Sequence, residues 1–312
     1  MRAFLLSAAL ATLAACSPDA VTGPNADVRG GVSGTTLTPD AEGLAYARSR
    51  RSVDQTFDAL TRALEAAPPV GIVAQIDHAA NAANAGLDLR PTRVVLFGNP
   101  ALGTPLMQRS QTAGIDLPQK VLVYENAVGQ VLAAYNTTDY LADRHGLAGV
   151  ETLPTIAGAL ERFVGDVTVG TVKTLPSGVT EGEGLVVTAS ADGIDETYSR
   201  LRAAITGNPN LTLAAELDHQ ANAARVGQEL RPTRLLVFGN PALGTPLMQR
   251  EQTIGLDLPQ KMLVWEDAAG DVFVAYNDPF YLAERHGLDG ADDALDAIAG
   301  ALATLAAVAT GS

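Results

Sequence analysis

Four histidines are the side chains of this chain best suited to proton transfer or metal binding, and they occupy two recurring positions. His78 and His219 are 141 residues apart, and so are His145 and His286. Imidazole exchanges protons near neutral pH and is a common metal ligand, so both positions are candidates for chemistry. His145 and His286 each lie beside an arginine in the last turn of a predicted helix, where a cation complements the helix dipole. We therefore interpret that pair as structural.

The other pair begins a short predicted helix directly after a strand. Asp77 precedes His78, and Asn81 follows on the same helical face. The second copy repeats these residue types at Asp218, His219 and Asn222. The aspartate either orients the imidazole or caps the helix, and we favour the cap. Because a stable metal site uses three or four protein ligands, we expect no bound metal and no cofactor.

A glycine-containing loop, FGNPALGTP, supplies another candidate. It contains Asn99 and Thr104, and the second copy has Asn240 and Thr245 in their places. Free backbone N–H groups at a helix N-terminus attract negative charge, so the loop is a candidate cradle for a small anion or polar ligand. The alternative is that these residues serve only turn and cap geometry. The Thr-Pro pair at its end predicts a helix that starts at Pro105.

Lys120 and Lys261 complete the candidates. Each lies at the start of an apolar strand, and a desolvated lysine can act on a carbonyl group. The sequence places no partner beside either of them. It also has no nucleophile elbow, P-loop or dinucleotide fingerprint, so we lean against an enzyme.

All these candidates belong to a repeat. Residues 53–147 recur without a gap at 194–288, and 17 of 20 positions are identical between residues 90–109 and 231–250. In each copy, helical and β-strand patterns alternate, and a hairpin with a late glycine follows. These patterns predict the same compact unit twice.

The repeat also divides the chain. We expect a first repeat domain at 43–165, a linker at 166–183 and a second repeat domain at 184–312. Each domain should end in an apolar helix that contains the string IAGAL. In the last of these helices the leucines form one stripe, which favours packing against a sheet over crossing a membrane.

The N-terminus predicts export to the cell envelope. Residues 1–15 join one arginine to an apolar run too short to span a bilayer, which is typical of a secretory signal peptide. Residues 13–16, LAAC, resemble a bacterial lipobox, and Cys16 is the one cysteine of the chain. We expect a lipid at Cys16 and a flexible tether over 16–42. The lipid would attach the protein to the membrane, its expected partner, with the folded part on the periplasmic or extracellular side.

Composition excludes one class of partner. The 312 residues have a net charge of −14 and are 47% hydrophobic. A nucleic-acid binder needs a basic surface, and neither copy has a cluster of lysine and arginine. We therefore expect no nucleic acid as a partner.

The motifs FGNPALGTPLMQ, DLPQK and LAxRHGL, in this order in both copies, resemble the domain of unknown function 302 family. The resemblance covers nearly all of both copies. It implies an α+β domain with helices packed on an antiparallel sheet, similar to the TATA-binding-protein-like architecture. It also implies that the two copies form a pseudo-two-fold pair within one chain. It supplies no activity that can be assigned to particular residues.

These observations favour a binding or interaction module of the envelope, whose ligand is a small molecule or a protein bound near His78, Asn99 and their counterparts. The alternative is an enzyme or a metal- or haem-binding protein that uses the repeated Asp-His pairs. A purely structural envelope protein remains a third reading. The arrangement of His78, Asn99 and Lys120 in space would distinguish them.

Overall fold

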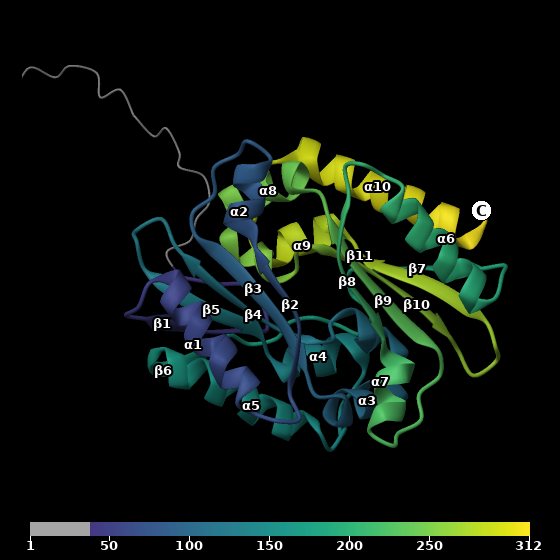
Figure 1. Ribbon diagram of the computed structural model, residues 1–312, viewed down its shortest axis with the longest axis horizontal. Coiled ribbons are helices and arrows are strands. Elements are labelled where there is room, and N and C mark those ends of the chain that lie inside the picture. The colour runs from purple at the N-terminus through teal and green to yellow at the C-terminus, as the bar shows by residue number, and fades with distance from the viewer. Residues whose placement is uncertain (1–37) are drawn as a thin grey trace, which may run out of the picture. The chain divides into compact units, whose positions relative to one another are not determined.

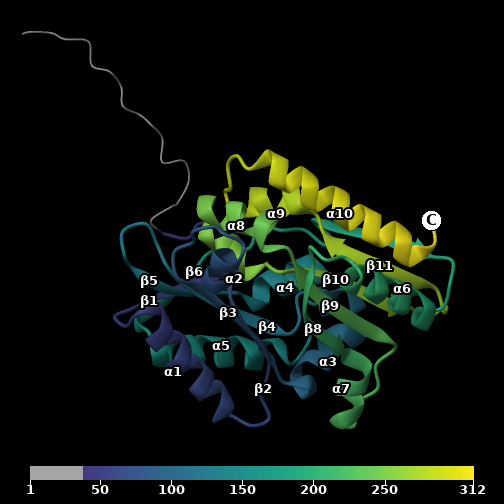
Figure 2. The same ribbon diagram turned by 45° about the horizontal axis from the view of Figure 1, so that its top comes forward.

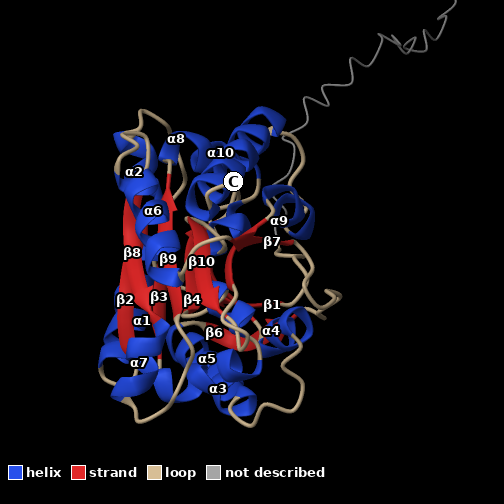
Figure 3. Ribbon diagram, turned by 90° about the vertical axis from the view of Figure 1, so that its right-hand side faces the viewer, coloured by secondary structure: helices blue, strands red, loops and turns tan. Residues whose placement is uncertain are grey.

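The computed structural model describes residues 38–312, so the expected signal peptide, Cys16 and most of the tether lie outside the described residues. Two antiparallel sheets face each other across a shared apolar layer, and each sheet has helices on its outer face (Figures 1 and 3). The predicted α+β fold with two tandem sheet-and-helix units is confirmed.

The first sheet has six strands in the order β2-β3-β4-β5-β1-β6, and neighbouring strands are antiparallel. Helices α1 and α5 lie on its outer face (Figure 2), and their apolar side chains join the core there. The elements of this half are β1 (Leu44–Ser49), α1 (Val53–Glu65), β2 (Gly71–Asp77), α2 (His78–Asn84), β3 (Thr92–Gly98), α3 (Pro100–Arg109), the 3-10 helix η1 (Gln111–Ile115), β4 (Gln119–Glu125), β5 (Val131–Asn136), α4 (Thr138–His145), α5 (Leu153–Val167) and β6 (Val169–Thr174).

The second sheet has five strands in the order β7-β11-β10-β9-β8, again antiparallel. Helices α6 and α10 cover its outer face (Figure 2). The elements of this half are β7 (Leu185–Ser190), α6 (Ile194–Thr206), β8 (Thr212–Asp218), α7 (His219–Arg225), β9 (Thr233–Gly239), α8 (Pro241–Arg250), the 3-10 helix η2 (Gln252–Leu256), β10 (Gln260–Glu266), β11 (Val272–Asn277), α9 (Pro279–Arg285) and α10 (Asp292–Thr310).

The gapless repeat corresponds to one fold used twice. Phe97 lies in β3 and Phe238 lies at the equivalent place in β9. Both follow the same pairing: Phe97 is opposite Gln119 and Phe238 is opposite Gln260. The predicted shift of 141 residues therefore holds in strand register as well as in sequence.

Strand β4 shows how the layers are built. Val121 and Val123 join the core under the helices of the first repeat, whereas Leu122 and Tyr124 join the apolar layer between the sheets. Because side chains alternate along a strand, Lys120 also points to the inner side, between the two sheets. A charged residue thus starts a row that is otherwise apolar.

One helix starts earlier than predicted. α3 begins at Pro100, because the Asn99 side chain accepts a hydrogen bond from the Ala101 backbone N–H at 3.0 Å and Pro100 occupies the first helical position. Pro105, which we expected at the start, lies inside the helix. Thr104 is therefore no cap but a buried residue of the helix interior. Asn240 and Thr245 repeat this arrangement in α8.

The segments expected as tether and linker are partly ordered parts of the repeats. Strand β6 lies within the expected linker 166–183 and pairs with β1. At the end of the expected tether, Ala41 is buried and the Glu42 carbonyl accepts hydrogen bonds from Arg285. The Glu183 carbonyl accepts the equivalent bond from Arg144. The residues just before the first strand of each repeat thus bond an arginine of the other repeat.

Among the described helices, α10 is long and apolar enough to cross a membrane by length and composition alone. Its apolar stripe is buried in the core of the second repeat. The stripe consists of Leu295, Ile298, Leu302 and Leu305. The helix therefore packs as the apolar pattern predicted.

Candidate functional site: two cavities and a charged centre

A cavity of about 300 Å³, which we call the first cavity, lies where α2 of the first repeat meets α8 of the second. The first repeat contributes His78 and Asn81 to its wall, and the second contributes Asn240, Thr245 and Gln260. The rest of the wall is mainly apolar. Its larger side chains are Ile76, Leu211, Phe238, Leu243, Met248, Leu258, Ile298, Leu302 and Leu305.

A second cavity of about 370 Å³ repeats this construction with the roles of the repeats exchanged. Here α7 supplies His219 and Asn222, while the first repeat supplies Asn99, Thr104 and Gln119. Its larger apolar side chains are Val70, Ile72, Val73, Phe97, Leu102, Met107, Leu117, Ile156, Leu160, Phe163 and Leu217. Small cavities of this kind, apolar with a few polar groups, are typical of ligand sites.

The structure therefore brings together residues that the sequence analysis grouped differently. We expected His78 to lie with Asn99, but His78 lies with Asn240, and Asn99 lies with His219. Each cavity needs both repeats. Lys120, the third residue of the expected group, lines neither cavity.

The aspartates before the two histidines act as helix caps, as expected. Asp77 Oδ1 accepts a hydrogen bond from the Ala80 backbone N–H, and Asp218 Oδ1 accepts one from Ala221, both at 2.8 Å. Their other oxygens lie 3.6 Å and 3.8 Å from arginines of the neighbouring strand. Neither carboxylate is hydrogen-bonded to its neighbouring imidazole in the described part of the chain.

The two cavity histidines are neutral at physiological pH. Burial lowers the pKa of His78 and of His219 to about 4. His78 Nε2 lies 3.1 Å from the Gly255 carbonyl oxygen, so this nitrogen carries the proton and donates it. Nδ1 is then a hydrogen-bond acceptor. Such an imidazole can accept a hydrogen bond from a ligand but adds no charge.

Four buried hydroxyl and amide groups in the cavity walls have no protein partner within residues 38–312, and His219 Nε2 makes no hydrogen bond there either. The four are the hydroxyl groups of Thr104 and Thr245 and the side-chain nitrogens of Gln119 and Gln260. All four residues are more than nine-tenths buried. An unpaired buried polar group costs about 1–3 kcal/mol, so these positions favour a polar partner inside each cavity.

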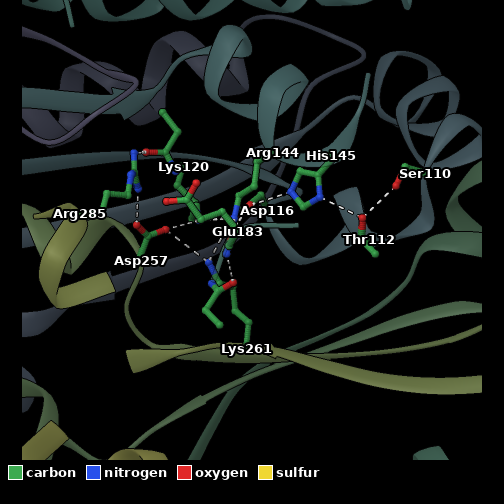
Figure 4. A network of polar contacts seen from close by, with 12 residues as sticks. Ser110, Thr112, Asp116, Lys120, Arg144, His145, Glu183, Asp257, Lys261 and Arg285 are labelled. Atoms are coloured by element: carbon green, nitrogen blue, oxygen red, sulfur yellow. Dashed lines mark hydrogen bonds and ion pairs between the residues drawn. The ribbon is translucent and has the colours of Figure 1, made fainter. Parts of the chain in front are cut away.

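A second polar region, the charged centre, lies between the sheets (Figure 4). We define it as Asp116, Lys120, Arg144 and His145 with their counterparts Asp257, Lys261, Arg285 and His286. All eight side chains are buried. The sequence analysis did not identify Asp116 or Asp257, although their exact repetition at the 141-residue shift was a usable signal.

Within each repeat the carboxylate binds an arginine and a histidine. Asp116 Oδ2 accepts hydrogen bonds from Arg144 Nη1 at 2.8 Å and from His145 Nε2 at 3.0 Å. The corresponding distances to Asp257 Oδ2 in the second repeat are 2.7 Å and 3.0 Å. The other imidazole nitrogen of His145 accepts from the Thr112 hydroxyl at 3.0 Å.

Across the repeats the centre forms an interlock. Lys120 Nζ donates to Asp257 Oδ1 at 3.2 Å, which answers the question of its missing partner. Arg144 Nη2 donates to Asn277 Oδ1 at 3.0 Å, and Arg285 Nη2 donates to Asn136 Oδ1 at 2.8 Å. Lys261 Nζ lies 3.7–3.8 Å from both carboxylates.

The charge state of the centre follows from burial and pairing. Burial alone would raise the pKa of Asp116 and of Asp257, but the surrounding arginines, histidines and lysines hold both well below the usual range. Burial, together with the neighbouring Lys120, lowers the pKa of Lys261 to about 7. Two buried lysines thus compete for the same two carboxylates.

The sequence interpretation of His145 and His286 as helix-end cations was wrong. Burial lowers the pKa of both, so they are neutral donors to Asp116 and Asp257 instead. Their position at a helix end was visible in the sequence, but their burial between the repeats was not. In the described range 38–312, no group of three or more histidine, cysteine, aspartate or glutamate side chains could hold a metal ion.

Comparison with known proteins agrees with the repeat. The sequence model described as domain of unknown function DUF302 matches residues 46–163 and 186–305. The chain is 44% identical over 110 residues to proteins named fluoride-specific ion channel FluC 1 from Brucella suis and Brucella abortus. That match covers 35% of this chain and 43% and 40% of those proteins, so the chain spans less than half of their length.

One solved structure, of an uncharacterized conserved DUF302 protein from Bacillus stearothermophilus, is 16% identical to the chain. It has a TM-score of 0.37, and the match covers 41% of this chain and 98% of that one.

Proposed function

The chain belongs to the DUF302 family, and on that premise we propose that it is a binding module with two equivalent small-molecule sites. The observation behind this proposal is the pair of cavities, each apolar and each containing an imidazole, a threonine hydroxyl and a glutamine amide. The same set occurs twice, and its threonine hydroxyls and glutamine nitrogens have no partner within residues 38–312. The ligand supported best is a small, mainly apolar molecule with a polar end.

The charged centre supports a binding module over an enzyme, because its reactive side chains do not reach either cavity. Its lysines line neither cavity, and both are buried among carboxylates. A lysine without access to a substrate does not act on a carbonyl group. The centre therefore has a structural role: it holds the two repeats in the register that forms the cavities.

The alternative, an enzyme or a metal- or haem-binding protein that uses the Asp-His pairs, is less well supported. The carboxylate oxygens of Asp77 and Asp218 are engaged by backbone N–H groups and by arginines. The name of the Brucella relatives concerns fluoride channels, and the match covers less than half of each of those proteins, so we do not propose fluoride transport here.

The test uses two methionines, because Met107 lines the second cavity and Met248 lines the first. With methyl-labelled methionine, NMR during a screen of small amphiphiles reports each cavity separately, and the buried Met262 of β10 serves as internal control. We expect binders to shift the Met107 and Met248 methyl signals. A diverse library that shifts neither signal would contradict the proposal.

Matched blocking variants make the test site-specific. Gly103 and Gly244 line the second and first cavities, and a Cβ at either meets only a leucine methyl, at 3.7 Å and 3.6 Å. Gly103→Leu should remove ligand shifts at Met107 only, and Gly244→Leu should remove them at Met248 only. Loss of both responses in either single variant would mean that the signals do not report separate sites.

We further propose that the module works in the bacterial cell envelope, anchored by a lipid at Cys16 and facing the periplasm or the exterior. The support is the signal-like sequence of residues 1–15 and the lipobox pattern before Cys16. Cys16→Ala should move the protein from the membrane fraction to the soluble fraction, since stable anchoring needs the lipid. Membrane association that survives this change, with or without added salt, would overturn the anchor.

A further inference from the structure

The two cavities differ at one wall position in a way that changes the charge. Arg225, at the end of α7, lines the second cavity, and the equivalent residue in the first repeat is Asn84. Arg225 is exposed and donates one hydrogen bond to Asn222 at 3.0 Å. It forms no ion pair with a carboxylate in the described part of the chain. Its charge is therefore available at the mouth of the second cavity.

A second arginine lies near the same cavity. The Arg162 guanidinium carbon is 4.8 Å from the ring centroid of Phe163, and Phe163 lines the second cavity. The equivalent positions at the first cavity are Thr304 and Leu305. At both positions, the arginine thus lies at the second cavity and an uncharged residue takes its place in the other repeat.

Acidic residues show the opposite distribution. Asp77 is among the wall residues of the first cavity, whereas no described aspartate or glutamate lines the second. No lysine or arginine of the described range lines the first. In a chain with a net charge of −14, an anion is repelled unless a local cation compensates. The second cavity has that cation, and the first does not.

We propose that the second cavity binds an amphiphile with an apolar body and one anionic head, such as a monocarboxylate, and that the first cavity binds a neutral molecule of similar shape. The apolar body lies among Phe97, Leu160 and Phe163, and the head meets Arg225, whose planar guanidinium can bind a carboxylate through two hydrogen bonds. This inference rests on the proposed binding function and adds the ligand class and the difference between the sites.

The experiment compares octanoate with octanol, which share an alkyl chain, by following the Met107 and Met248 methyl signals at neutral pH. Octanol should bind both cavities with similar affinity. Octanoate should bind the second cavity roughly 3- to 10-fold more tightly than the first, as expected for one partly exposed charge-assisted contact. Added salt should reduce that preference.

Exchange variants complete the test. Arg225→Asn, which installs the first-cavity residue type, should abolish the octanoate preference, so that octanoate binds the two cavities with similar affinity. Asn84→Arg should bring octanoate binding to the Met248 signal. Arg51→Asn removes an exposed charge that lines neither cavity and is the control. Arg225 and Asn84 are exposed, so both variants should fold, which thermal unfolding checks.

Two outcomes would overturn the inference. The first is an octanoate titration that shifts both methionine signals equally, and the second is an Arg225→Asn variant that keeps the octanoate preference. Either result, with octanol still bound, removes the anionic specificity and leaves the binding module standing. If other amphiphiles shift the signals but neither octanoate nor octanol does, the ligand class is wrong. If no compound of the screen shifts them, the proposed function itself fails.

Discussion

The cavities and the charged centre are both built between the repeats, and both appear in two equivalent halves, but their polar groups are used in opposite ways. In the charged centre each carboxylate has an arginine and a histidine within 3.0 Å. In the cavity walls, two threonine hydroxyls and two glutamine amides have no partner within residues 38–312. In the first region the polar groups are paired with charged protein groups, even where Asp116 Oδ1 and Lys261 Nζ form an ion pair at 3.8 Å without a hydrogen bond. In the second region the four hydroxyl and amide groups leave hydrogen-bonding capacity for another molecule.

The difference teaches that reactive residue types are not the best guide to the site in this chain. Lysine, arginine and aspartate are the strongest candidates on chemical grounds, and here they join two halves of one fold. Threonine, glutamine and neutral histidine are the groups that a ligand meets. If this distinction is correct, perturbing the charged centre should change stability, and perturbing the cavities should change binding.

The largest expected effect is the response of stability to acid. The pKa of His78 and of His219 lies at about 4 in the folded protein, against 6.5 for the free side chain. The unfolded chain therefore takes up more protons between these values, and stability that is complete above about pH 6.5 is lost as the pH falls towards 4. The two residues together correspond to roughly 7 kcal/mol, and the lowered pKa values of His145 and His286 act in the same direction.

Urea unfolding at a series of pH values measures this loss. The double variant His78→Gln with His219→Gln should have a shallower pH dependence, and the remaining slope should come from the histidines of the charged centre. Below about pH 3.8, protonation of Asp116 and Asp257 should add a further loss, since their folded pKa values are depressed. A free energy of unfolding that stays constant from about pH 7 to about pH 4.5 would contradict the assignment of neutral, buried imidazoles.

The next effect concerns the charged centre alone. Asp257→Asn keeps the shape but leaves Arg285 buried without its carboxylate and Lys120 with Asp116 alone, 3.7 Å away, so we expect a loss of about 3–5 kcal/mol in the free energy of unfolding. The control is Asp54→Asn, because Asp54 pairs with Arg93 at 3.0 Å but is 78% exposed. That change should cost less than about 1 kcal/mol. Equal effects of the two changes would remove the structural role of the centre.

The sequence predicted local features of this molecule well because they depend on neighbouring residues. Each copy has the alternating helices and strands that its patterns predicted, since apolar periodicity specifies which face is buried. The predicted hairpin with a late glycine is the β4–β5 pair, with Gly129 in its turn. The repeat then gave the second half of the fold. The start of α3 was missed because Asn99 and Thr104 are each followed by proline, so both fit the pattern of a helix cap. In the structure, Asn99 is the cap.

Contacts between the repeats were not predictable in the same way. Lys120 and Asp257 are 137 residues apart in sequence, and no local pattern indicates that they meet. The repeat identified His78 and Asn99 as candidate residues, but two similar copies give no sign of whether a residue packs within its own copy or across to the other. That His78 shares a cavity with Asn240 and not with Asn99 depends on how the two sheets face each other.

The smallest expected effect compares one substitution in the two regions. Thr253 and Thr245 are both buried threonines of the second repeat. The Thr253 hydroxyl lies 2.9 Å from both His286 Nδ1 and Glu251 Oε1, so Thr253→Val should cost about 1–2 kcal/mol by removing this shared hydrogen-bond partner. The Thr245 hydroxyl has no partner among residues 38–312, so Thr245→Val should leave stability unchanged or raise it by up to about 1 kcal/mol.

Denaturant unfolding compares the two variants, and the Met248 methyl signal reports their ligand affinity. Thr245→Val should weaken the binding of amphiphiles to the first cavity, because the ligand loses a hydrogen-bonding group, while Thr253→Val should leave that binding unchanged in the folded protein. This pair is the most direct test, since the change in chemistry is the same and only the region differs. If both variants lose the same stability, Thr245 has a protein partner and the cavity wall is no different from the charged centre.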